Sequence, residues 1–295
     1  MRINTNVSSL TAQEAAKSTN NSISNSLEKL SSGLKINKAS DDASGLAIAD
    51  KLRTQVTSIN QGVSNGNSAI ALLQIADKSM AEQSKILDTV KSKLIQANTD
   101  TTSQAGRTAI AKDVTKLLDQ LNNIAKQTNY NGTTLLQATA TNPAQKSALS
   151  FQVGESNLDL IKTKNIQANV NGYSLAPLKG HVSAGAALTA GATATAAGAF
   201  TRAFASAGQK AVDRAITVLN GYRGDIGSTQ NQVESAVRNL MTQSTNIKNA
   251  ESVLRDVDYA EESANFNKLN IISQAGSYAI SQSNAVSQNV LRLLQ

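Results

Sequence analysis

The stretch SSGLKINKASDDASGLAIADKLRTQ, residues 31–55, separates two segments whose apolar residues recur at helical spacing. Gly33 can end the first segment in the left-handed conformation that closes many helices. Ser40, Asp41 and Asp42 carry side-chain oxygens that can accept hydrogen bonds from the free amides of a following helix, and carboxylates are favourable beside its positive end. The stretch therefore predicts two helices joined by a turn, with Ser40, Asp41 and Asp42 as the capping residues.

The two adjoining carboxylates could instead bind a metal ion or act in acid–base catalysis. Either role needs further ligands or a histidine nearby, and the only histidine, His181, lies in an Ala/Gly-rich tract. With one histidine and no cysteine, the sequence contains neither a zinc-protease motif nor a convincing Ser-His-Asp set. We therefore expect a structural role for the pair, no enzymatic activity, no bound metal and no cofactor.

Helical periodicity extends in both directions from this turn. Apolar residues alternate between steps of three and four residues before the turn, and again from Leu46 to Leu87 after it, as in a coiled-coil seam. Residues 108–127 repeat the pattern, so three helices are predicted to fill most of residues 5–129. The pattern returns near Gly208 and runs to Val257 as one very long helix, and a weaker segment occupies residues 267–295.

The region between the third and fourth helices has a different character. Asn131-Gly132 marks a turn, and residues 149–154 and 160–170 alternate well enough to predict a small β-hairpin. Residues 181–201 consist largely of Ala, Gly and Thr, which are too weakly apolar for a transmembrane helix. We interpret residues 174–204 as a variable surface segment.

The basic character of the chain could indicate a nucleic-acid or lipid partner, because its formal net charge is +7. However, no two basic residues are adjacent, and no aromatic residues accompany them as a stacking platform. A solvated charged face is the better interpretation. We expect neither nucleic acid nor membrane as a partner, which argues against a coiled-coil nucleoid or surface-binding protein.

Both chain ends have narrow apolar seams diluted by Ser, Asn and Gln. Ordering such a helix costs about 1–2 kcal/mol per residue, so we expect the ends to fold against each other and against neighbouring copies. The predicted polymer seam is Leu10, Ile23, Leu27, Leu30, Leu34, Leu269, Ile272, Ala279, Val286, Val290 and Leu293. The predicted core of the remaining helices is Leu52, Val56, Ile59, Val63, Leu73, Leu117, Leu121, Val233, Val237 and Leu240.

Residues 31–55 strongly resemble the N-terminal signature of bacterial flagellins. The C-terminal stretch that begins AESVLRDVDYAEESANFNKLN resembles the matching end signature, and NYNGTTLLQ and GDIGSTQNQVESAVRNL resemble inner regions of the same family. The resemblance covers roughly residues 1–138 and 205–295. It implies a mainly α fold whose terminal helices pair as a coiled coil, called D0. The next layer, D1, is a helical bundle with a small β-hairpin, and the outer domains D2 and D3 are absent or vestigial.

The resemblance also implies a division of the chain. Residues 1–42 would form the N-terminal D0 helix and loop, and residues 43–173 the N-terminal D1 helices and hairpin. Residues 174–204 would form the variable segment, 205–252 the C-terminal D1 helix and 253–295 the C-terminal D0 helix.

The function implied is that of a filament subunit, exported by the flagellar type III apparatus and secreted into the extracellular filament. Its partners would be other copies of itself, an export chaperone at the C-terminal helix, and the filament cap and hook-junction proteins. A hook–filament junction adaptor is the alternative, since such proteins resemble flagellins at both ends.

Residues 87–96, LDTVKSKLIQ, depart from flagellins that activate the Toll-like flagellin receptor of animals. Those flagellins present an arginine-rich patch here, whereas this chain has Thr89 in place of an arginine and Lys93 in place of an apolar residue. Arginine is a planar, multi-donor anchor that threonine cannot replace. The altered patch, which resembles the Campylobacter and Helicobacter group, predicts weak or absent receptor activation. It comprises Leu87, Asp88, Thr89, Lys91, Lys93 and Asp113.

Overall fold

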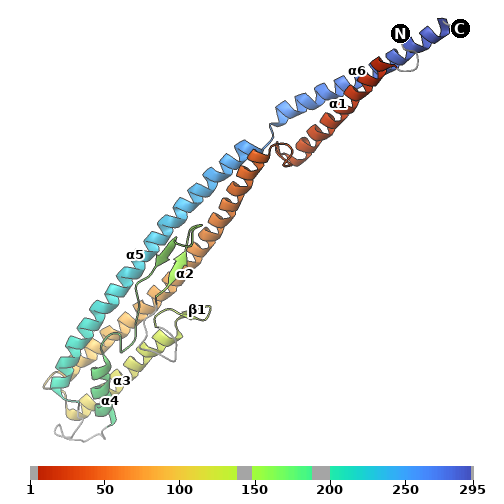
Figure 1. The fold of residues 1–295 in the computed structure, drawn as a ribbon. Coiled ribbons are helices and arrows are strands. Elements are labelled where there is room, and N and C mark those ends of the chain that lie inside the picture. Colours follow the sequence, from red (N-terminus) through yellow and green to blue (C-terminus); the bar gives the residue numbers. More distant parts are fainter. Residues whose placement is uncertain (1–5, 138–147, 188–199, 294–295) are drawn as a thin grey trace. The chain divides into compact units, whose positions relative to one another are not determined.

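The structure, a computed structural model, describes residues 6–137, 148–187 and 200–293 and is mainly α-helical (Figure 1). The helices are α1 (Val7–Ser32), α2 (Ala43–Ala97), α3 (Gln104–Gln127), α4 (Ala176–Ala187), α5 (Arg202–Arg255) and α6 (Tyr259–Leu293). The strands are β1 (Asn129–Tyr130), β2 (Thr133–Thr134), β3 (Ser150–Gln152) and β4 (Leu160–Lys162). These elements confirm the predicted mainly α fold with small hairpins, and the described residues contain no large outer domain.

The chain forms two compact units. The first unit comprises residues 1–57 and 243–295, and the second comprises residues 58–242. The boundaries fall inside α2 and α5 and not in loops, so each of these long helices contributes to both units. The division of the chain at residues 42, 173, 204 and 252 remains a prediction.

The turn between α1 and α2 is built as a helix stop followed by a helix start. Gly33 has a φ of 74°, and its amide donates to the Lys29 carbonyl at 2.9 Å. Asp42 accepts a hydrogen bond from the Gly45 amide at 2.9 Å, which caps α2. Asp41 instead accepts from the Asn37 and Lys38 amides, and these bonds lower the pKa of its carboxyl group.

The capping prediction is therefore wrong in its detail. Asp41 closes the preceding turn, and the exposed Ser40 side chain takes part in neither set of bonds. Asp42 is the one residue of the predicted three whose side chain caps α2 through these bonds.

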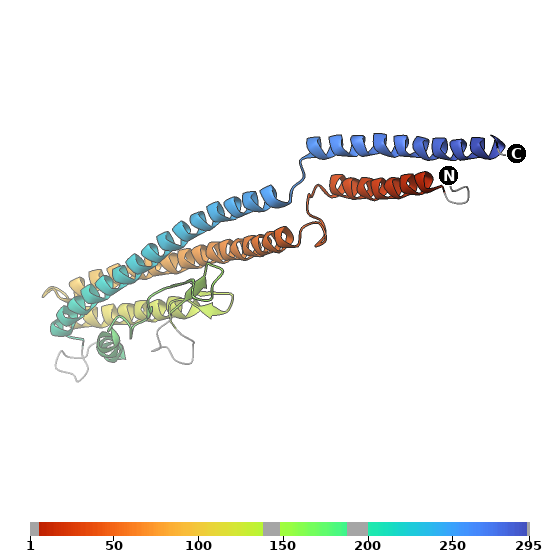
Figure 2. The same cartoon turned by 45° about the horizontal axis from the view of Figure 1, so that its top comes forward.

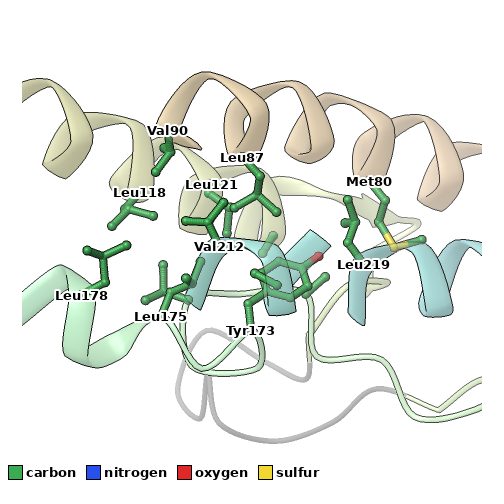
Figure 3. Close-up of a cluster of buried hydrophobic side chains, with 14 of the residues drawn as sticks. Met80, Leu87, Val90, Leu118, Leu121, Tyr173, Leu175, Leu178, Val212 and Leu219 are labelled. Carbon is green, nitrogen blue, oxygen red and sulfur yellow. The ribbon is translucent and has the colours of Figure 1, made fainter. Parts of the chain in front are cut away.

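The core of the second unit lies where α2, α3, α4 and α5 meet (Figure 3). Met80 and Leu87 of α2 face Leu121 of α3 and Leu219 of α5, and all four are fully buried. The antiparallel β3–β4 hairpin pairs Phe151 with Ile161, and it packs on a second cluster that contains Val233 and Val237 of α5. In the β1–β2 hairpin, Asn131 and Gly132 both have positive φ, as the predicted turn requires.

Residues 174–187 and 200–204 do not form a surface connector, contrary to our interpretation. Leu175, Leu178 and Val182 project from α4 or its start into the core, and Phe200 is fully buried. Gly185 allows α4 to pack closely against Phe200, because a Cβ at Gly185 would lie 2.6 Å from Cβ of Phe200. Residues 188–199 lie outside the described residues.

A buried polar centre ties α2, α3 and the segment before α4 together. The Gln83 amide donates to the carbonyls of Leu121 at 3.2 Å and Ala168 at 2.8 Å, and its oxygen accepts from the Tyr173 hydroxyl at 2.8 Å. Gln83 has no exposed surface and Tyr173 is 1% exposed. Every polar atom of the Gln83 side chain thus has a partner, which buried polar groups require.

Burial raises the pKa of Tyr173 well above its usual value, with a smaller contribution from Tyr222. Above about pH 10 the unfolded chain loses this phenolic proton while the folded chain keeps it, so folding stability falls as the pH rises. Urea unfolding followed by circular dichroism between pH 8 and 11 should show this loss, and the loss should be smaller in Tyr173→Phe. Ionisation of Tyr173 in the intact fold, detected by ultraviolet absorbance, would contradict the expectation.

Candidate assembly surface on the terminal helices

Helices α1 and α6 of the first unit lie side by side and antiparallel along their length (Figures 1 and 2). Three hydrogen-bonded contacts mark the antiparallel register along the pair. Asn6 bonds Ser283 at 3.2 Å, Asn20 bonds Ser273 at 3.2 Å, and Ser26 bonds Glu262. Asn6 also caps α1 by accepting from the Ser9 amide at 3.1 Å.

The contact between α1 and α6 follows a regular alternation of three- and four-residue steps, which we call the inner seam. Its positions are buried or half-buried. On α1 they are Ser9, Ala12, Ala16, Thr19, Ile23, Ser26 and Leu30, and on α6 they are Glu262, Phe266, Leu269, Ser273, Gly276, Ile280 and Ser283. Most of these side chains are small or polar, so the inner seam buries little apolar area.

Large apolar side chains lie on the other faces of the same two helices. We call them the outer apolar set: Val7, Leu10, Leu27, Ile271, Ile272, Tyr278 and Val286. Their exposed fractions range from 43% for Ile272 to 74% for Tyr278. Exposed large apolar residues that together form a contiguous patch mark a surface that another molecule covers.

The predicted polymer seam therefore divides into two groups. Ile23, Leu30 and Leu269 lie on the inner seam, whereas Leu10, Leu27, Ile272, Ala279 and Val286 are exposed. The expectation that all of them face one another across α1 and α6 is wrong for the second group. These residues do not fall on the alternating three- and four-residue steps of the inner seam, so they lie on other faces of the two helices. The side chains of Val290 and Leu293 lie outside the described residues.

The small and polar members of the inner seam were not predicted from the sequence. Ala12, Ala16 and Thr19 are spaced by four and three residues, which was a usable signal. A search for large apolar residues passes over such positions. Gly276 is a further case, since a Cβ there would lie 4.0 Å from Cβ of Ala16.

A short backbone bridge joins the two connections at the end of this helix pair. Leu34 pairs with Asp256 in an antiparallel bridge, the Lys35 amide donates to the Arg255 carbonyl at 2.6 Å, and the Val257 amide donates to the Gly33 carbonyl at 3.0 Å. These bonds fix the chain before α2 against the chain before α6. Leu34, the one predicted seam residue not yet placed above, is half-buried in this bridge.

The predicted core residues are all withdrawn from solvent to some degree. Val56, Ile59, Leu73, Leu121, Val233 and Val237 are buried, and Leu52, Val63, Leu117 and Leu240 are half-buried. On α3 the better core residue is Leu118, which is fully buried next to the predicted Leu117.

Most of the altered receptor patch lies on the surface of α2 and α3. Lys91 forms an ion pair with Asp213 at 2.6 Å, Lys93 forms one with Asp113 at 3.0 Å, and Asp88 and Thr89 are exposed. Leu87 does not belong to the patch, because it is fully buried in the core of the second unit.

These features define a mainly α-helical protein whose two chain ends pair through a weakly apolar contact. In the described residues, no group of three or more His, Cys, Asp or Glu could hold a metal ion. None of the described helices is long and apolar enough to cross a membrane.

Comparison with known proteins identifies the family. The profile of the bacterial flagellin N-terminal helical region matches residues 3–141, and that of the C-terminal helical region matches residues 209–294. The chain is 34% identical to a flagellin of Bacillus subtilis, with all of both chains covered. It is 31% identical to the flagellar filament 30.7 kDa core protein of Treponema maltophilum, again with full coverage of both. The chain belongs to the bacterial flagellin family.

The fold is shared more widely than the sequence. A solved structure of a hook-associated flagellar protein from Vibrio parahaemolyticus aligns with 73% of this chain and 99% of its own. The TM-score is 0.60, but the sequences are only 13% identical. This likeness concerns the fold alone.

Proposed function

We propose that this chain is the structural subunit of a bacterial flagellar filament and assembles with copies of itself through α1 and α6. The observation that supports the proposal is the outer apolar set, which the chain by itself leaves in water. Covering a large apolar side chain completely is worth about 1.5–3 kcal/mol. Burying several half-exposed ones in a polymer would help to offset the cost of ordering the two terminal helices.

The family relatives support the same assignment, since they include a flagellin and a filament core protein at full coverage of both chains. We further propose that the chain is exported and reaches the extracellular filament. Its exposed α6 face suits an export chaperone that covers Ile271, Ile272 and Tyr278 before assembly. Contacts with cap and hook-junction proteins would use the same terminal helices at the filament ends.

We propose that the chain binds neither nucleic acid nor membranes, and the dispersed ion pairs on its surface support this. Basic residues pair with acids at separate places on the second unit, such as Lys164 with Asp225 at 2.7 Å and Arg223 with Asp77 at 2.9 Å. Such pairs leave a mixed charged surface, which is a poor phosphate-binding track.

Removal of residues 267–295 tests the role of α6 in assembly. We expect the shortened chain to stay in the supernatant after addition of a precipitant salt, under conditions that pellet the full chain. The second unit should still unfold cooperatively, because its core does not use these residues. Pelleting of the shortened chain as ordered filaments would refute the proposed surface.

A hook–filament junction adaptor is the alternative function, and the shared fold of the hook-associated structure is compatible with it. The two functions differ in what the purified chain does alone. A filament subunit grows into long polymers, whereas an adaptor needs its neighbours in the junction.

Weak or absent activation of the animal Toll-like flagellin receptor is a further expected result. Lys91 and Lys93 are held in ion pairs, and Thr89 donates its hydroxyl to the Lys85 carbonyl within α2. The patch therefore offers no arginine fork at position 89 to a partner. A receptor-reporter cell line should stay near background at concentrations where an activating flagellin saturates. Full potency would contradict the expectation.

A further inference from the structure

A cavity of about 430 Å³ lies in the second unit, beside α3, the segment before α4 and α4 itself. Its described lining residues are Asn122, Lys126, Gln137, Asn169, Val170, Asn171, Ala176, Lys179, Gly180 and Ser183. This volume is within the usual range for small-molecule sites. All its described lining residues belong to the second unit, so the cavity has no part in the proposed assembly function of α1 and α6.

Hydrogen bonds fix the orientation of three side-chain amides at this cavity, two of them directly through backbone amides. The Gly172 amide donates to Oδ1 of Asn169 at 2.8 Å, so Nδ2 of Asn169 is the atom that donates to Oε1 of Gln137 at 2.8 Å. The Val170 amide likewise donates to Oδ1 of Asn122 at 2.9 Å. The amide oxygens of all three side chains are therefore already occupied.

The donor left over by this arrangement is Nε2 of Gln137. The side chain is only 1% exposed, and this nitrogen has no hydrogen-bond partner among the described residues. A buried amide nitrogen without an acceptor is unfavourable, and such groups in native structures call for an explanation. An acceptor supplied by a ligand, reached by a small rotation of the Gln137 side chain, would satisfy it.

The electrostatics of the cavity favour a negatively charged acceptor. Lys126 and Lys179 line it, and none of its described lining residues is acidic. Lys179 also forms an ion pair with Asp119 of α3 at 2.6 Å, which positions its ammonium group but offsets part of its charge. In addition, α4 begins at Ala176 in the lining, and its first turn carries no acidic residue that would neutralise the positive end of the helix.

We propose that this cavity is a binding site for a small oxyanion, a solute that carries a phosphate or a carboxylate group. The Lys126 and Lys179 ammonium groups supply the charge, and Nε2 of Gln137 supplies a directed hydrogen bond. The start of α4 adds its dipole, although Pro177 has no amide hydrogen and the Lys179 amide already donates to the Leu175 carbonyl at 2.9 Å.

The test uses the full-length, ¹⁵N-labelled monomer, titrated separately with inorganic phosphate and with citrate against chloride at the same ionic strength. We expect saturable shifts of the Gln137 side-chain amide with at least one of the two anions and none with chloride. A response to phosphate alone assigns the site to phosphate esters, and a response to citrate alone assigns it to carboxylates. Shifts that never saturate, or that chloride reproduces, would overturn the proposal.

Substitutions at the two lysines separate a built site from general attraction to a basic chain. The double variant Lys126→Ala/Lys179→Ala should bind the anion at least about tenfold more weakly, because it loses two charge-assisted contacts. Lys116→Ala is the matched control, since Lys116 is exposed on α3 and does not line the cavity. Its affinity should equal that of the unchanged chain, and equal affinity in the double variant would contradict the site.

Discussion

Replacing Ile272 with aspartate is expected to raise the critical concentration for filament formation by more than about 100-fold. Ile272 is 43% exposed in the outer apolar set of α6, and the proposed polymer would cover it in every subunit. The substitution removes its apolar contribution and asks the interface to bury an unpaired charge, which together cost about 3 kcal/mol or more. Sedimentation of assembled protein over a concentration series measures the effect.

The matched control for this substitution is Asn267→Asp. Asn267 is an exposed polar residue of the same helix, so the charge change is equal while no apolar side chain is lost. We expect a much smaller shift for the control. Circular dichroism of the Ile272→Asp monomer should show the second unit intact, and collapse of helicity throughout the monomer would refute the division between assembly surface and core.

Replacing Gln83 with leucine is expected to lower the free energy of unfolding of the second unit by about 3 kcal/mol. Leucine has a similar size but leaves the Ala168 carbonyl and the Tyr173 hydroxyl buried without the partners that Gln83 supplies. Each such group costs about 1–3 kcal/mol when it loses its partner. Urea unfolding of the dissociated monomer, followed by circular dichroism, measures this change in the free energy of unfolding.

Two further variants distinguish the polar centre from a simple packing effect. Gln74→Leu makes the same change at an exposed position of α2 and should alter stability by no more than about 0.5 kcal/mol. Combining Gln83→Leu with Tyr173→Phe should cost less than the sum of the single changes, because the second substitution removes the stranded hydroxyl. Strict additivity would contradict direct coupling between Gln83 and Tyr173.

The long helices could be predicted from the sequence because their core faces consist of large apolar residues at regular steps. Val56, Ile59, Leu73, Val233 and Val237 are such residues, and each is buried. Gly33 and Asn131-Gly132 were equally readable, since positive φ selects glycine and asparagine at these turns.

Other features were not predicted from the sequence, because large apolar side chains were assumed to be the ones that form the contact between helices. In the terminal helices the relation is reversed: Ser9 and Ser26 are buried while Leu10 and Leu27 are exposed. A one-residue change of register moves a residue from one helix face to another, and periodicity alone could not choose between two faces that both carry apolar residues.

Helix α4 was missed for a related reason. Its Ala and Gly content suggested a connector, although Leu175, Leu178 and Val182 have the spacing of a short buried face. The oxyanion cavity could not be found from sequence at all, because it depends on three side-chain amides that are distant in the chain and are oriented by hydrogen bonds of the folded structure.

Electron microscopy of the purified, heat-dissociated full chain after addition of a precipitant salt or short filament seeds tests the central claim most directly. We expect long helical filaments formed by this chain alone, because assembly covers the exposed faces of α1 and α6. Persistently monomeric protein with intact helices would contradict it and would favour the junction adaptor.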